Sequence, residues 1–479
     1  MAREASDEGA SGGNRPARAA VVMAAGQGTR MKSSLAKVLH PVAGRAMIHY
    51  VVREALALGC SPVVVVVGHQ RAEVQAALAR EFPGKPVTCV VQEVQRGTAH
   101  AVACAQPALA DFQGDVFILS GDVPGLPASV LEALDAAAGE AAVGVLGMQL
   151  ADPAAYGRLI QDAAGELCSI VEYKDATPTQ RALNEVNAGV YRVRAGFLFD
   201  ALARIDANNA QGEFYLTDII GLSVAACLGA RALVLRGRDA EAAFGVNDRV
   251  DLAAAEARMQ SVLRRRLMLG GATLLAPESV TVHDGVTVGP DTLIEPGVML
   301  LGRTHIGAGC VVEQGSRLED TTVADGAVVH AYTHTVDTVI GAGASVGPFA
   351  RLREGTVLDA RVKIGNFVET KKAVFGEGAK ASHLSYLGDA SIGAGANVGA
   401  GTITCNYDGK NKFRTEIGPG AFIGSDTQLV APVRVGAGAF VGAGTTVTQD
   451  VPPGALALSR TPQKNIEGWV LRQATKERT

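Results

Sequence analysis

Residues 280–319 read VTVHDGVTVGPDTLIEPGVMLLGRTHIGAGCVVEQGSRLE, with an aliphatic residue at every sixth position. The same spacing returns twice further along the chain. In a parallel β-helix, each coil stacks its inward side chains on those of the coil before, and glycines form the corners. The repeat therefore predicts a parallel β-helix over residues 271–465. The repeating aliphatic positions are Val282, Val288, Ile294, Leu300, Ile306, Val312 and Leu318, then Ile340, Val346, Leu352, Leu358 and Ile364, then Ile417, Ile423, Leu429, Val435, Val441 and Val447.

The six-residue period is interrupted at residues 371–386 and at residues 406–415. Coils that serve only as a spacer have little need of polar insertions, so both segments are expected to be loops that carry function. The first segment contains Lys371, Lys372, His383 and Tyr386, and the second begins with Asn406-Tyr407.

The repeat ends sharply on its N-terminal side. Of the 57 glycines in the 479 residues, 29 lie within residues 271–450, which predicts a domain boundary near residue 270. Just before it, residues 250–270 have the pattern of a linker helix. Asp251 is its expected N-cap, and Gly270-Gly271 is its expected stop.

The first part of the chain contains continuous apolar runs, at Ala19–Ala25, Pro62–Val67 and Asp115–Leu119. Such runs are typical of parallel strands that helices cover on both faces. Segments with helical spacing separate them, so residues 19–249 are predicted to form a Rossmann-like, doubly wound α/β domain. Ligands of these domains bind at the carboxyl ends of the strands.

A glycine loop, Gly26-Gln27-Gly28-Thr29-Arg30-Met31, follows the first run, and Lys37 comes shortly after it. Glycines let backbone N–H groups approach phosphates, and Arg30 and Lys37 add cations. Neither GxGxxG nor the P-loop pattern fits. Taken alone, the loop is explained equally well as a tight turn with solvated cations.

Asp122 follows the third run, at a strand tip. One carboxylate there, together with substrate phosphates, can hold Mg²⁺, which keeps several waters. Mn²⁺ would be accepted by the same oxygen ligands. A turn or cap aspartate is the simpler explanation for this residue alone. Further polar groups lie between the later apolar segments. They are Gln92, Gly97-Thr98, Tyr156-Gly157-Arg158, residues 171–175, residues 185–189 and Gly245-Val246-Asn247.

Composition narrows the class of protein. Lysine and arginine total 44 against 48 aspartates and glutamates, a net charge of -4, which argues against a nucleic-acid partner. No apolar run approaches the ~18 residues of a membrane span. The seven cysteines form no CxxC pair, so a reducing cytoplasm is expected. Residues 1–18 are expected to be a disordered extension, and residues 466–479 a disordered C-terminal tail of mixed charge.

The loop from Ala24 to Met31 with Lys37 resembles the signature of sugar-nucleotide pyrophosphorylases. With the later polar groups and the repeat, residues 19–470 are similar to a bacterial bifunctional family. Its members join an N-acetylglucosamine-1-phosphate uridylyltransferase to a glucosamine-1-phosphate N-acetyltransferase, and make UDP-N-acetylglucosamine for cell-wall polysaccharides. The resemblance implies a cytoplasmic homotrimer with a left-handed β-helix. It also implies Mg²⁺ and the substrates UTP, acetyl-CoA, glucosamine 1-phosphate and N-acetylglucosamine 1-phosphate.

The resemblance implies the following uridylyltransferase site. Arg30 and Lys37 face the phosphates and are counted as catalytic. The nucleotide also contacts Ala24, Ala25, Gly26 and Gln92, with Gly97 and Thr98 at the base. The sugar is held by Gly157, Glu172 and Asn187, and the metal by Asp122 and Asn247. Two positions depart from the family: Ala36 replaces the usual proline before Lys37, and Ser120 replaces a common aromatic residue before Gly121.

For the acetyltransferase site, the resemblance implies His383 as the general base. An imidazole titrates close to neutral pH, which suits that role. The remaining residues are assigned as follows: Arg353 and Lys371 to the sugar phosphate, Tyr386 and Asn397 to the sugar, and Ala400, Asn406, Tyr407, Ser425, Ala443 and Arg460 to acetyl-CoA.

Two alternatives compete with this reading. One is a pyrophosphorylase whose β-helix only builds the oligomer or binds a regulator, against which Arg353, Lys371 and His383 argue. The other is a non-catalytic scaffold that retains both folds, against which Lys37 and Asp122 argue. Assays of acetyl-CoA consumption and of UTP-dependent pyrophosphate release distinguish these two alternatives from the bifunctional enzyme.

Overall fold

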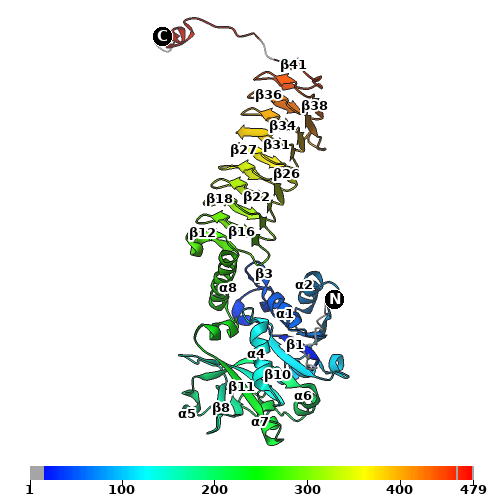
Figure 1. Cartoon of the computed structure of the whole chain (residues 1–479), viewed down its shortest axis with the longest axis vertical. Coiled ribbons are helices and arrows are strands. Elements are labelled where there is room, and N and C mark those ends of the chain that lie inside the picture. Colours follow the sequence, from blue (N-terminus) through cyan, green and yellow to red (C-terminus); the bar gives the residue numbers. More distant parts are fainter. Residues whose placement is uncertain (1–15, 69, 460–461, 477–479) are drawn as a thin grey trace, which may run out of the picture. The chain divides into compact units, whose positions relative to one another are not determined.

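The computed structural model describes residues 16–68, 70–459 and 462–476. The chain divides into two compact units, Met1–Met259 and Gln260–Thr479. The division falls inside helix α8 (Arg249–Leu269). Figure 1 shows an α/β unit before α8 and a stack of short strands after it.

The first unit is built on one mixed sheet with the strand order β11-β7-β10-β6-β1-β4-β5. β10 runs antiparallel to β6 and β7, while β1 is parallel to β4 and β6. The predicted doubly wound sheet is therefore present, with one reversed strand. Its strands are β1 (Arg18–Ala24), β4 (Val63–Val67), β5 (Val87–Val91), β6 (Asp115–Ser120), β7 (Val143–Gln149), β10 (Glu185–Arg194) and β11 (Ala230–Leu235), with β8 (Arg158–Gln161) and β9 (Leu167–Val171) attached to β10, and a separate pair β2 (Pro41–Val42) and β3 (Arg45–Ala46).

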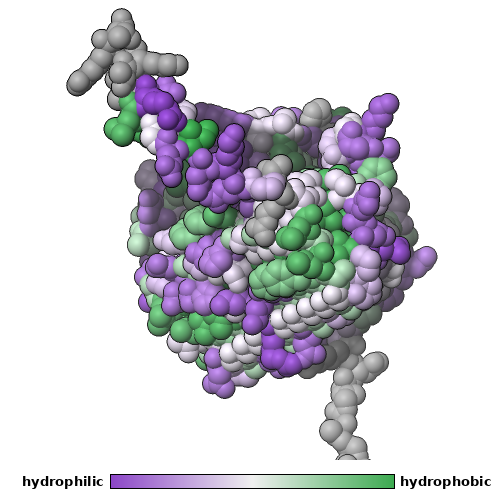
Figure 2. Space-filling model, turned by 90° about the horizontal axis from the view of Figure 1, so that it is seen from above, coloured by the Kyte–Doolittle hydropathy of each residue, from purple (hydrophilic) through white to green (hydrophobic). Residues whose placement is uncertain are grey.

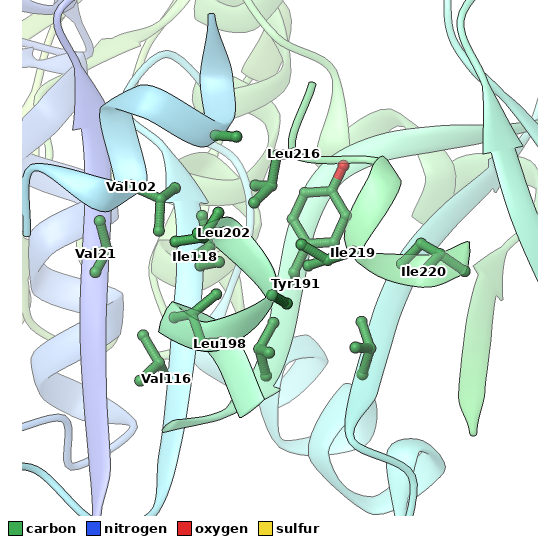
Figure 3. Packing of buried hydrophobic residues seen from close by; sticks show 14 of the residues in the cluster. Val21, Val102, Val116, Ile118, Tyr191, Leu198, Leu202, Leu216, Ile219 and Ile220 are labelled. Atoms are coloured by element: carbon green, nitrogen blue, oxygen red, sulfur yellow. The ribbon is translucent and has the colours of Figure 1, made fainter. Parts of the chain in front are cut away.

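Alternate residues of the central strands point to opposite faces of this sheet, and each face is buried. Val21 of β1 packs on one side with α3, α6 and α7, whereas Ala20 and Val22 pack on the other with α1, α2 and α4. Figure 3 shows the first of these layers, in which Ile118 and Tyr191 lie close to Leu198. The helices of the unit are α1 (Met47–Ala57), α2 (Arg71–Glu81), α3 (Thr98–Ala103), α4 (Ala128–Ala138), α5 (Pro178–Arg181), α6 (Ala195–Leu202) and α7 (Asp218–Ala225), with short 3-10 turns η1 (Thr29–Met31), η2 (Lys37–Leu39), η3 (Gln106–Leu109) and η4 (Gly237–Ala243).

Two expected boundaries of this unit are corrected. The Asp248 carboxylate accepts hydrogen bonds from the backbone N–H of Val250 (2.8 Å) and Asp251 (3.0 Å), so Asp248 caps α8 and Asp251 lies in its first turn. Residues 1–15 of the expected extension lie outside the described residues. Arg18 belongs to β1, because it pairs with Asp115 and binds the Asp135 carboxylate at 2.5 Å.

The second unit is a parallel β-helix of three sheets, called here the first, second and third sheet in the order in which each coil visits them. The first sheet contains β12 (Thr273–Leu274), β15 (Leu293–Ile294), β18 (Val311–Val312), β21 (Val328–Val329), β24 (Ser345–Val346), β27 (Lys363–Asn366), β30 (Lys380–His383), β33 (Asn397–Val398), β36 (Phe422–Ile423), β39 (Phe440–Val441) and β41 (Leu456–Ala457). The second contains β13 (Thr281–Val282), β16 (Met299–Leu301), β19 (Arg317–Glu319), β22 (His334–Val336), β25 (Arg351–Leu352), β28 (Glu369–Lys371), β31 (Tyr386–Gly388), β34 (Ile403–Cys405), β37 (Gln428–Val430) and β40 (Thr446–Val447). The third contains β14 (Thr287–Val288), β17 (His305–Ile306), β20 (Thr322–Val323), β23 (Thr338–Ile340), β26 (Thr356–Leu358), β29 (Val374–Phe375), β32 (Ala390–Ile392), β35 (Thr415–Ile417) and β38 (Val433–Val435).

The repeating aliphatic residues point inward, as predicted. All of them except Val288 are buried, with at most 4% of their surface exposed. A short 3-10 turn, η5 (Pro277–Ser279), lies beside the first coil.

The interruption predicted at residues 371–386 is wrong. β28 to β31 continue the three ladders without an inserted loop. The period is lost because some coils have 17 residues instead of 18: Val312 pairs with Val329, and Val329 with Val346. Only the second interruption leaves the coil, as a loop closed by a bridge between Tyr407 and Lys412.

The C-terminal tail also differs from expectation. Trp469–Lys476 form helix α9, in which Trp469, Val470 and Leu471 are more than half exposed. Apolar surface also remains at the end of the β-helix, where Leu456 and Leu458 are exposed. Figure 2, which looks toward this end, shows green apolar residues among purple polar ones.

Two further findings concern the described residues as a whole. None of their helices is both long enough and apolar enough to cross a lipid bilayer. All seven cysteines are free thiols.

We expect the β-helix to depend on its inward stacking. Ile364→Ala removes a fully buried side chain, and cavity formation should lower the free energy of unfolding by about 2–5 kcal/mol. Urea unfolding at equal chain concentration measures this loss. Its exposed neighbour in β27, Lys363→Ala, is the matched control and should change stability by less than about 0.5 kcal/mol. Equal losses in the two variants would contradict the role of stacking.

Candidate active sites

Three distant segments bring one cluster of charges together at the carboxyl end of the first unit's sheet. Lys37 opens η2, Asp122 follows β6, and Asn247 precedes α8. The Lys37 Nζ atom lies 2.5 Å from Asp122 Oδ2 and 3.2 Å from Asn247 Oδ1. The Arg30 guanidinium donates to the same Asn247 oxygen at 2.9 Å. Four residues expected to act together therefore do lie together.

The glycine loop allows this arrangement. Gly28 has φ +61°, and a Cβ at that position would lie 2.7 Å from the Lys37 Cβ. Only glycine lets the Lys37 side chain pack so closely on the loop. The expected proline before Lys37 is Ala36, which takes φ −54°, close to the value that proline would impose. Ala36 therefore adopts a backbone conformation that a proline could also hold.

A cavity of about 670 Å³ adjoins the cluster and is lined by Arg30, Asn247, Tyr156 and Arg258 among others. Burial, together with Asp251 and Asp122 nearby, raises the pKa of Tyr156. The Tyr156 hydroxyl therefore remains protonated at neutral pH. The cavity offers two guanidinium groups beside the cluster, a suitable surface for a polyanion.

Of the residues expected at the nucleotide, Gln92 lines a second cavity of about 600 Å³, together with Gln95 and Arg71. Ala24, Ala25 and Gly26 line a separate small pocket with Lys37. Ala24 ends β1, and Ala25 and Gly26 follow it. Gln92 is buried, and its Nε2 lies 3.0 Å from His100 Nδ1 and 3.4 Å from the Gly97 carbonyl. These contacts hold the amide of Gln92 in place.

Gly97 and Thr98 lie beside Gln92 and contact the segment before α7. Gly97 has φ +111°, and a Cβ there would lie 2.5 Å from the Phe214 carbonyl oxygen. The Thr98 hydroxyl accepts a hydrogen bond from the Leu216 N–H at 3.0 Å. Both residues thus have a structural requirement in addition to the expected contact with the base.

The three residues expected at the sugar are neighbours. The Asn187 N–H donates to the Gly157 carbonyl at 2.9 Å, and a Cβ at Gly157 would lie 3.4 Å from both carboxylate oxygens of Glu172. Burial raises the pKa of Glu172. The absence of a side chain at Gly157 therefore leaves a small space beside the Glu172 carboxylate and Ile170.

Neither of the two residues that hold this group has a role predicted from the sequence, although Arg158 follows Gly157 in a stretch of candidate polar groups. The fully buried Tyr191 accepts a hydrogen bond from Asn187 Nδ2 at 2.7 Å. Arg158 is 1% exposed and donates to the carbonyls of Ala154 (3.0 Å) and Arg181 (3.2 Å). Their only sequence signal is adjacency, since each lies one to four residues from an expected site residue.

A larger cavity, of about 1050 Å³, lies at the opposite edge of the sheet, beside Arg18, Asp115 and Arg192. Arg192 and Asp115 form a buried ion pair at 2.8 Å. None of the expected site residues lines this cavity. Size alone therefore does not identify the site.

In the second unit, two basic residues expected at a sugar phosphate lie on successive coils of the second sheet. Arg353 donates to Glu369 Oε1 at 3.0 Å, and Lys371 Nζ lies 2.8 Å from Glu354 Oε1. The hydrogen bond to Glu369 raises the pKa of Arg353, and that from Lys371 lowers the pKa of Glu354. Both cations are held in place by carboxylates.

Tyr386 and Asn406 approach each other across Gly388. A Cβ at Gly388 would lie 2.4 Å from the Tyr386 hydroxyl and 2.9 Å from Asn406 Nδ2. Asn406 is buried and donates to Asp389 Oδ2 at 2.7 Å. Tyr407, the next residue, is 60% exposed in the loop that leaves the coil.

The remaining expected residues follow one corner of the β-helix, where the first sheet gives way to the second. His383 ends β30 and is exposed at this corner, paired in register with Asn366. Ala400, Ser425 and Ala443 occupy the corner on later coils, where the Asp426 N–H donates to the Ala400 carbonyl at 2.7 Å. Asn397 instead faces outward from the first sheet. Arg460 lies outside the described residues.

Comparisons with known proteins match both units of the chain. Family models match residues 20–181 (MobA-like NTP transferase domain), 276–375 (GMPPB C-terminal domain) and 414–449 (bacterial transferase hexapeptide, six repeats). Relatives named "Bifunctional protein GlmU" include those of Anaeromyxobacter sp. strain Fw109-5 (54% identical; 95% of this chain, 93% of the relative), Sorangium cellulosum (53%; 95% and 96%) and Pelobacter propionicus (50%; 96% and 99%).

The chain belongs to the GlmU family.

Membership in the GlmU family confirms the expected class of enzyme. The chain is a bifunctional enzyme, with an NTP-transferase domain in its first unit and a hexapeptide-repeat transferase domain in its second. The β-helix is left-handed, as in hexapeptide transferases. Family membership therefore excludes the two alternatives, a pyrophosphorylase with an inert β-helix and a scaffold without activity.

The oxygen ligands expected for Mg²⁺ fit a cation. The Asp122 carboxylate and the Asn247 carboxamide oxygen converge on a single positive group, the Lys37 ammonium. Two protein oxygens are sufficient for Mg²⁺, because this ion keeps waters and takes further oxygens from phosphates. No group of three or more His, Cys, Asp or Glu side chains suited to a metal occurs among the described residues.

The raised pKa of Glu172 leads to a prediction about stability. The folded state binds this proton more tightly than the unfolded state, so stability falls as pH rises from about 4.5 through the raised pKa. Glu172→Gln removes the buried charge. At pH 8 this substitution should raise the melting temperature of the first unit by roughly 2–4 °C, which corresponds to about 1 kcal/mol in a domain of this size. At pH 4 it should not raise the melting temperature.

Scanning calorimetry at the two pH values measures this difference. The fully exposed Glu140 is the matched control, and Glu140→Gln should give no gain at pH 8. A gain for Glu172→Gln that is the same at pH 4 and pH 8 would show that the charge is not its cause.

Proposed function

We propose that the chain makes UDP-N-acetylglucosamine in two steps. The second unit transfers an acetyl group from acetyl-CoA to glucosamine 1-phosphate, and the first unit transfers a uridylyl group from UTP to the product. The observation that carries the proposal is the cluster of Arg30, Lys37, Asp122 and Asn247. Segments more than 200 residues apart supply two cations and two oxygen ligands at one point, as phosphoryl transfer requires.

In the uridylyl step, an oxygen of the sugar phosphate attacks the α-phosphorus of UTP, and pyrophosphate leaves. No side-chain nucleophile is needed. Arg30 and Lys37 neutralise charge on the transferring and leaving phosphates, and Gly157, Glu172 and Asn187 orient the sugar. Ala24, Ala25, Gly26, Gln92, Gly97 and Thr98 hold the uridine nucleotide. The anchored amide of Gln92 supports this assignment, because its orientation is fixed before the nucleotide binds.

Magnesium belongs to the same step. Asp122 and Asn247 would hold it, and it would supply positive charge to the phosphates. Lys37 must then leave these two oxygens, which its flexible four-carbon stem allows.

In the acetyl step, the amine of glucosamine 1-phosphate attacks the thioester carbonyl of acetyl-CoA. His383 accepts a proton from that amine, and the CoA thiol leaves. Arg353 and Lys371 bind the sugar phosphate, and Tyr386 and Asn397 position the sugar. Asn406 and Tyr407 lie beside the transferring group, while Ala400, Ser425, Ala443 and Arg460 contact CoA. The exposure of His383 beside these small residues supports the assignment, since a long substrate can reach it.

The enzyme acts as a homotrimer on small-molecule substrates. We assign the first domain to residues 19–249, the linker helix to residues 250–270 and the acetyltransferase domain to residues 271–465. The free state of all seven cysteines supports action in the reducing cytoplasm.

The two sites should fail independently. His383→Ala should lower the release of CoA thiol by about 10²–10⁴-fold, because it removes the base. Lys37→Ala should lower pyrophosphate release by about 10²–10³-fold, because it removes a cation from the transition state. Each variant should keep the other activity within about twofold.

The measurement supplies glucosamine 1-phosphate, acetyl-CoA, UTP and Mg²⁺, and follows thiol and pyrophosphate separately. A second assay supplies N-acetylglucosamine 1-phosphate directly. Wild-type protein that releases no thiol would overturn the acetyltransferase assignment. Loss of both activities in either variant would contradict independent sites.

Removal of the metal separates the same two steps. Excess EDTA should abolish pyrophosphate release and leave thiol release unchanged, since only the first unit offers the metal site. Added Mg²⁺ or Mn²⁺ should restore the uridylyl step. Equal inhibition of both steps by EDTA would show that the metal is not confined to the first unit.

A further inference from the structure

The segment that carries Arg30 and Lys37 has little regular structure of its own. Between β1 and β2 it contains two short turns, η1 with Arg30 and η2 with Lys37. Neither turn belongs to the strand order of the sheet. A single helical turn is only marginally stable by itself, so the positions of the two cations depend on contacts from other parts of the unit.

Arg249, the first residue of α8, contacts the ends of both turns. Its Nε donates to the carbonyl of Met31, which ends η1, at 3.2 Å. Its Nη1 lies 3.3 Å from Nδ1 of His40, which directly follows η2. A guanidinium group offers its N–H donors in fixed directions, so it can hold two acceptors at a set separation. Arg249 therefore bridges the turn of Arg30 and the turn of Lys37.

The side chain of His40 is suited to this contact. It is buried, and burial together with the nearby Arg249 guanidinium lowers its pKa. The imidazole is therefore neutral at neutral pH, and Nδ1 can accept a hydrogen bond. Nε2 is also buried and has no hydrogen-bond partner among the described residues. Because such an atom is unfavourable in the interior, burial alone would favour an apolar residue here, and the contact with Arg249 explains the histidine.

The residues just before Arg249 are connected to the oxygens expected to hold the metal. The Val246 N–H donates to the Asp122 carbonyl at 2.9 Å, and the Asn247 N–H donates to Asp251 Oδ2 at 2.8 Å. Asn247, whose side-chain oxygen belongs to the charge cluster, lies two residues before Arg249. One short stretch of chain therefore links these oxygens to the turns that carry the cations.

We propose that Arg249 is a positioning residue for uridylyl transfer. It fixes Arg30 and Lys37 relative to Asp122 and Asn247, so that both cations face the phosphates when the substrates bind. Its own contacts are with a carbonyl and an imidazole, so its effect passes through the two turns. Because the inference concerns the uridylyltransferase site, it rests on the proposed function.

Misplaced cations should produce a particular kinetic defect. Arg30 and Lys37 act on charge that develops in the transition state, so their displacement should lower kcat and leave KM little changed. Loss of a residue that binds the substrate itself would instead raise KM. Displacement of a reacting group by ~1 Å can lower the rate by on the order of 10²-fold.

The test is Arg249→Met in the full-length chain, assayed with UTP, N-acetylglucosamine 1-phosphate and Mg²⁺. We expect kcat for pyrophosphate release to fall by about 10–100-fold, with KM for both substrates within about threefold of the wild type. Thiol release by the second unit should stay within about twofold. The matched control is Arg265→Met, an exposed arginine on the same helix, which should keep pyrophosphate release within about twofold.

Variants of His40 test the same contact from its other side. Asparagine carries an acceptor oxygen on Cγ, as histidine carries Nδ1, so His40→Asn keeps an acceptor for Arg249. His40→Leu fills the space without one. We expect kcat within about threefold of the wild type for His40→Asn and at least about fivefold lower for His40→Leu. Adding His40→Leu to Arg249→Met should lower kcat by no more than about twofold, because both changes break one contact.

Thermal melting of each variant shows whether its first unit is folded. If Arg249→Met is unfolded, the comparison of His40→Asn with His40→Leu decides the inference. An unchanged kcat in folded Arg249→Met would overturn the inference. A raised KM with unchanged kcat would also overturn it, because Arg249 would then bind the substrate directly. Equal losses in the two His40 variants would overturn it as well.

The same assay separates this inference from the proposed function. A wild-type chain that releases no pyrophosphate from UTP would remove the uridylyltransferase assignment. An active wild type with an equally active Arg249→Met would remove only the positioning role and leave the activity standing.

Discussion

Each coil of the β-helix must bury its inward side chains against the next coil, because a single coil has no core of its own. This requirement determines where function can be placed. Inward positions hold mostly aliphatic, small or hydroxyl side chains such as Ile364, Ala381 and Thr370, and charged side chains are absent from the inward positions of the described coils. Chemistry is therefore confined to outward positions and corners, and His383, Arg353 and Lys371 all lie there.

Burial also limits where polar side chains can lie in the α/β unit. Its sheet is covered on both faces, so polar side chains are concentrated where strands end. Asp122 after β6 and Ala25 after β1 lie at such ends, and Asn187 lies at the bulge of β10. Separate buried residues then hold the site: Tyr191 orients Asn187, and Arg158 binds the carbonyls of the loop before Gly157.

Most of the architecture could be predicted from the sequence, since period and apolar runs report burial directly. The position of β1, the three-sheet coil and the inward direction of Leu352 all follow from such patterns. The supposed loop at residues 371–386 did not, because a coil of 17 residues breaks a six-residue period without breaking the ladder. The capping role of Asp248 was also missed, since two aspartates three residues apart are equivalent candidates in sequence.

Prediction from the sequence has the same limit at the candidate sites. Motifs were sufficient to name Lys37, Asp122 and Asn247, whereas only coordinates could show that one ammonium group contacts both oxygens. Supporting residues such as Tyr191 carry no motif, because their role is a single hydrogen bond from a buried hydroxyl.

The contact of Lys37 with Asp122 and Asn247 has an electrostatic consequence. The ammonium of Lys37 serves as an internal counter-ion to the Asp122 carboxylate. A magnesium ion held by Asp122 and Asn247 would take over this role and would leave the ammonium available to the phosphates of the substrate. The same lysine would thus balance the carboxylate before the substrate binds and the phosphates afterwards.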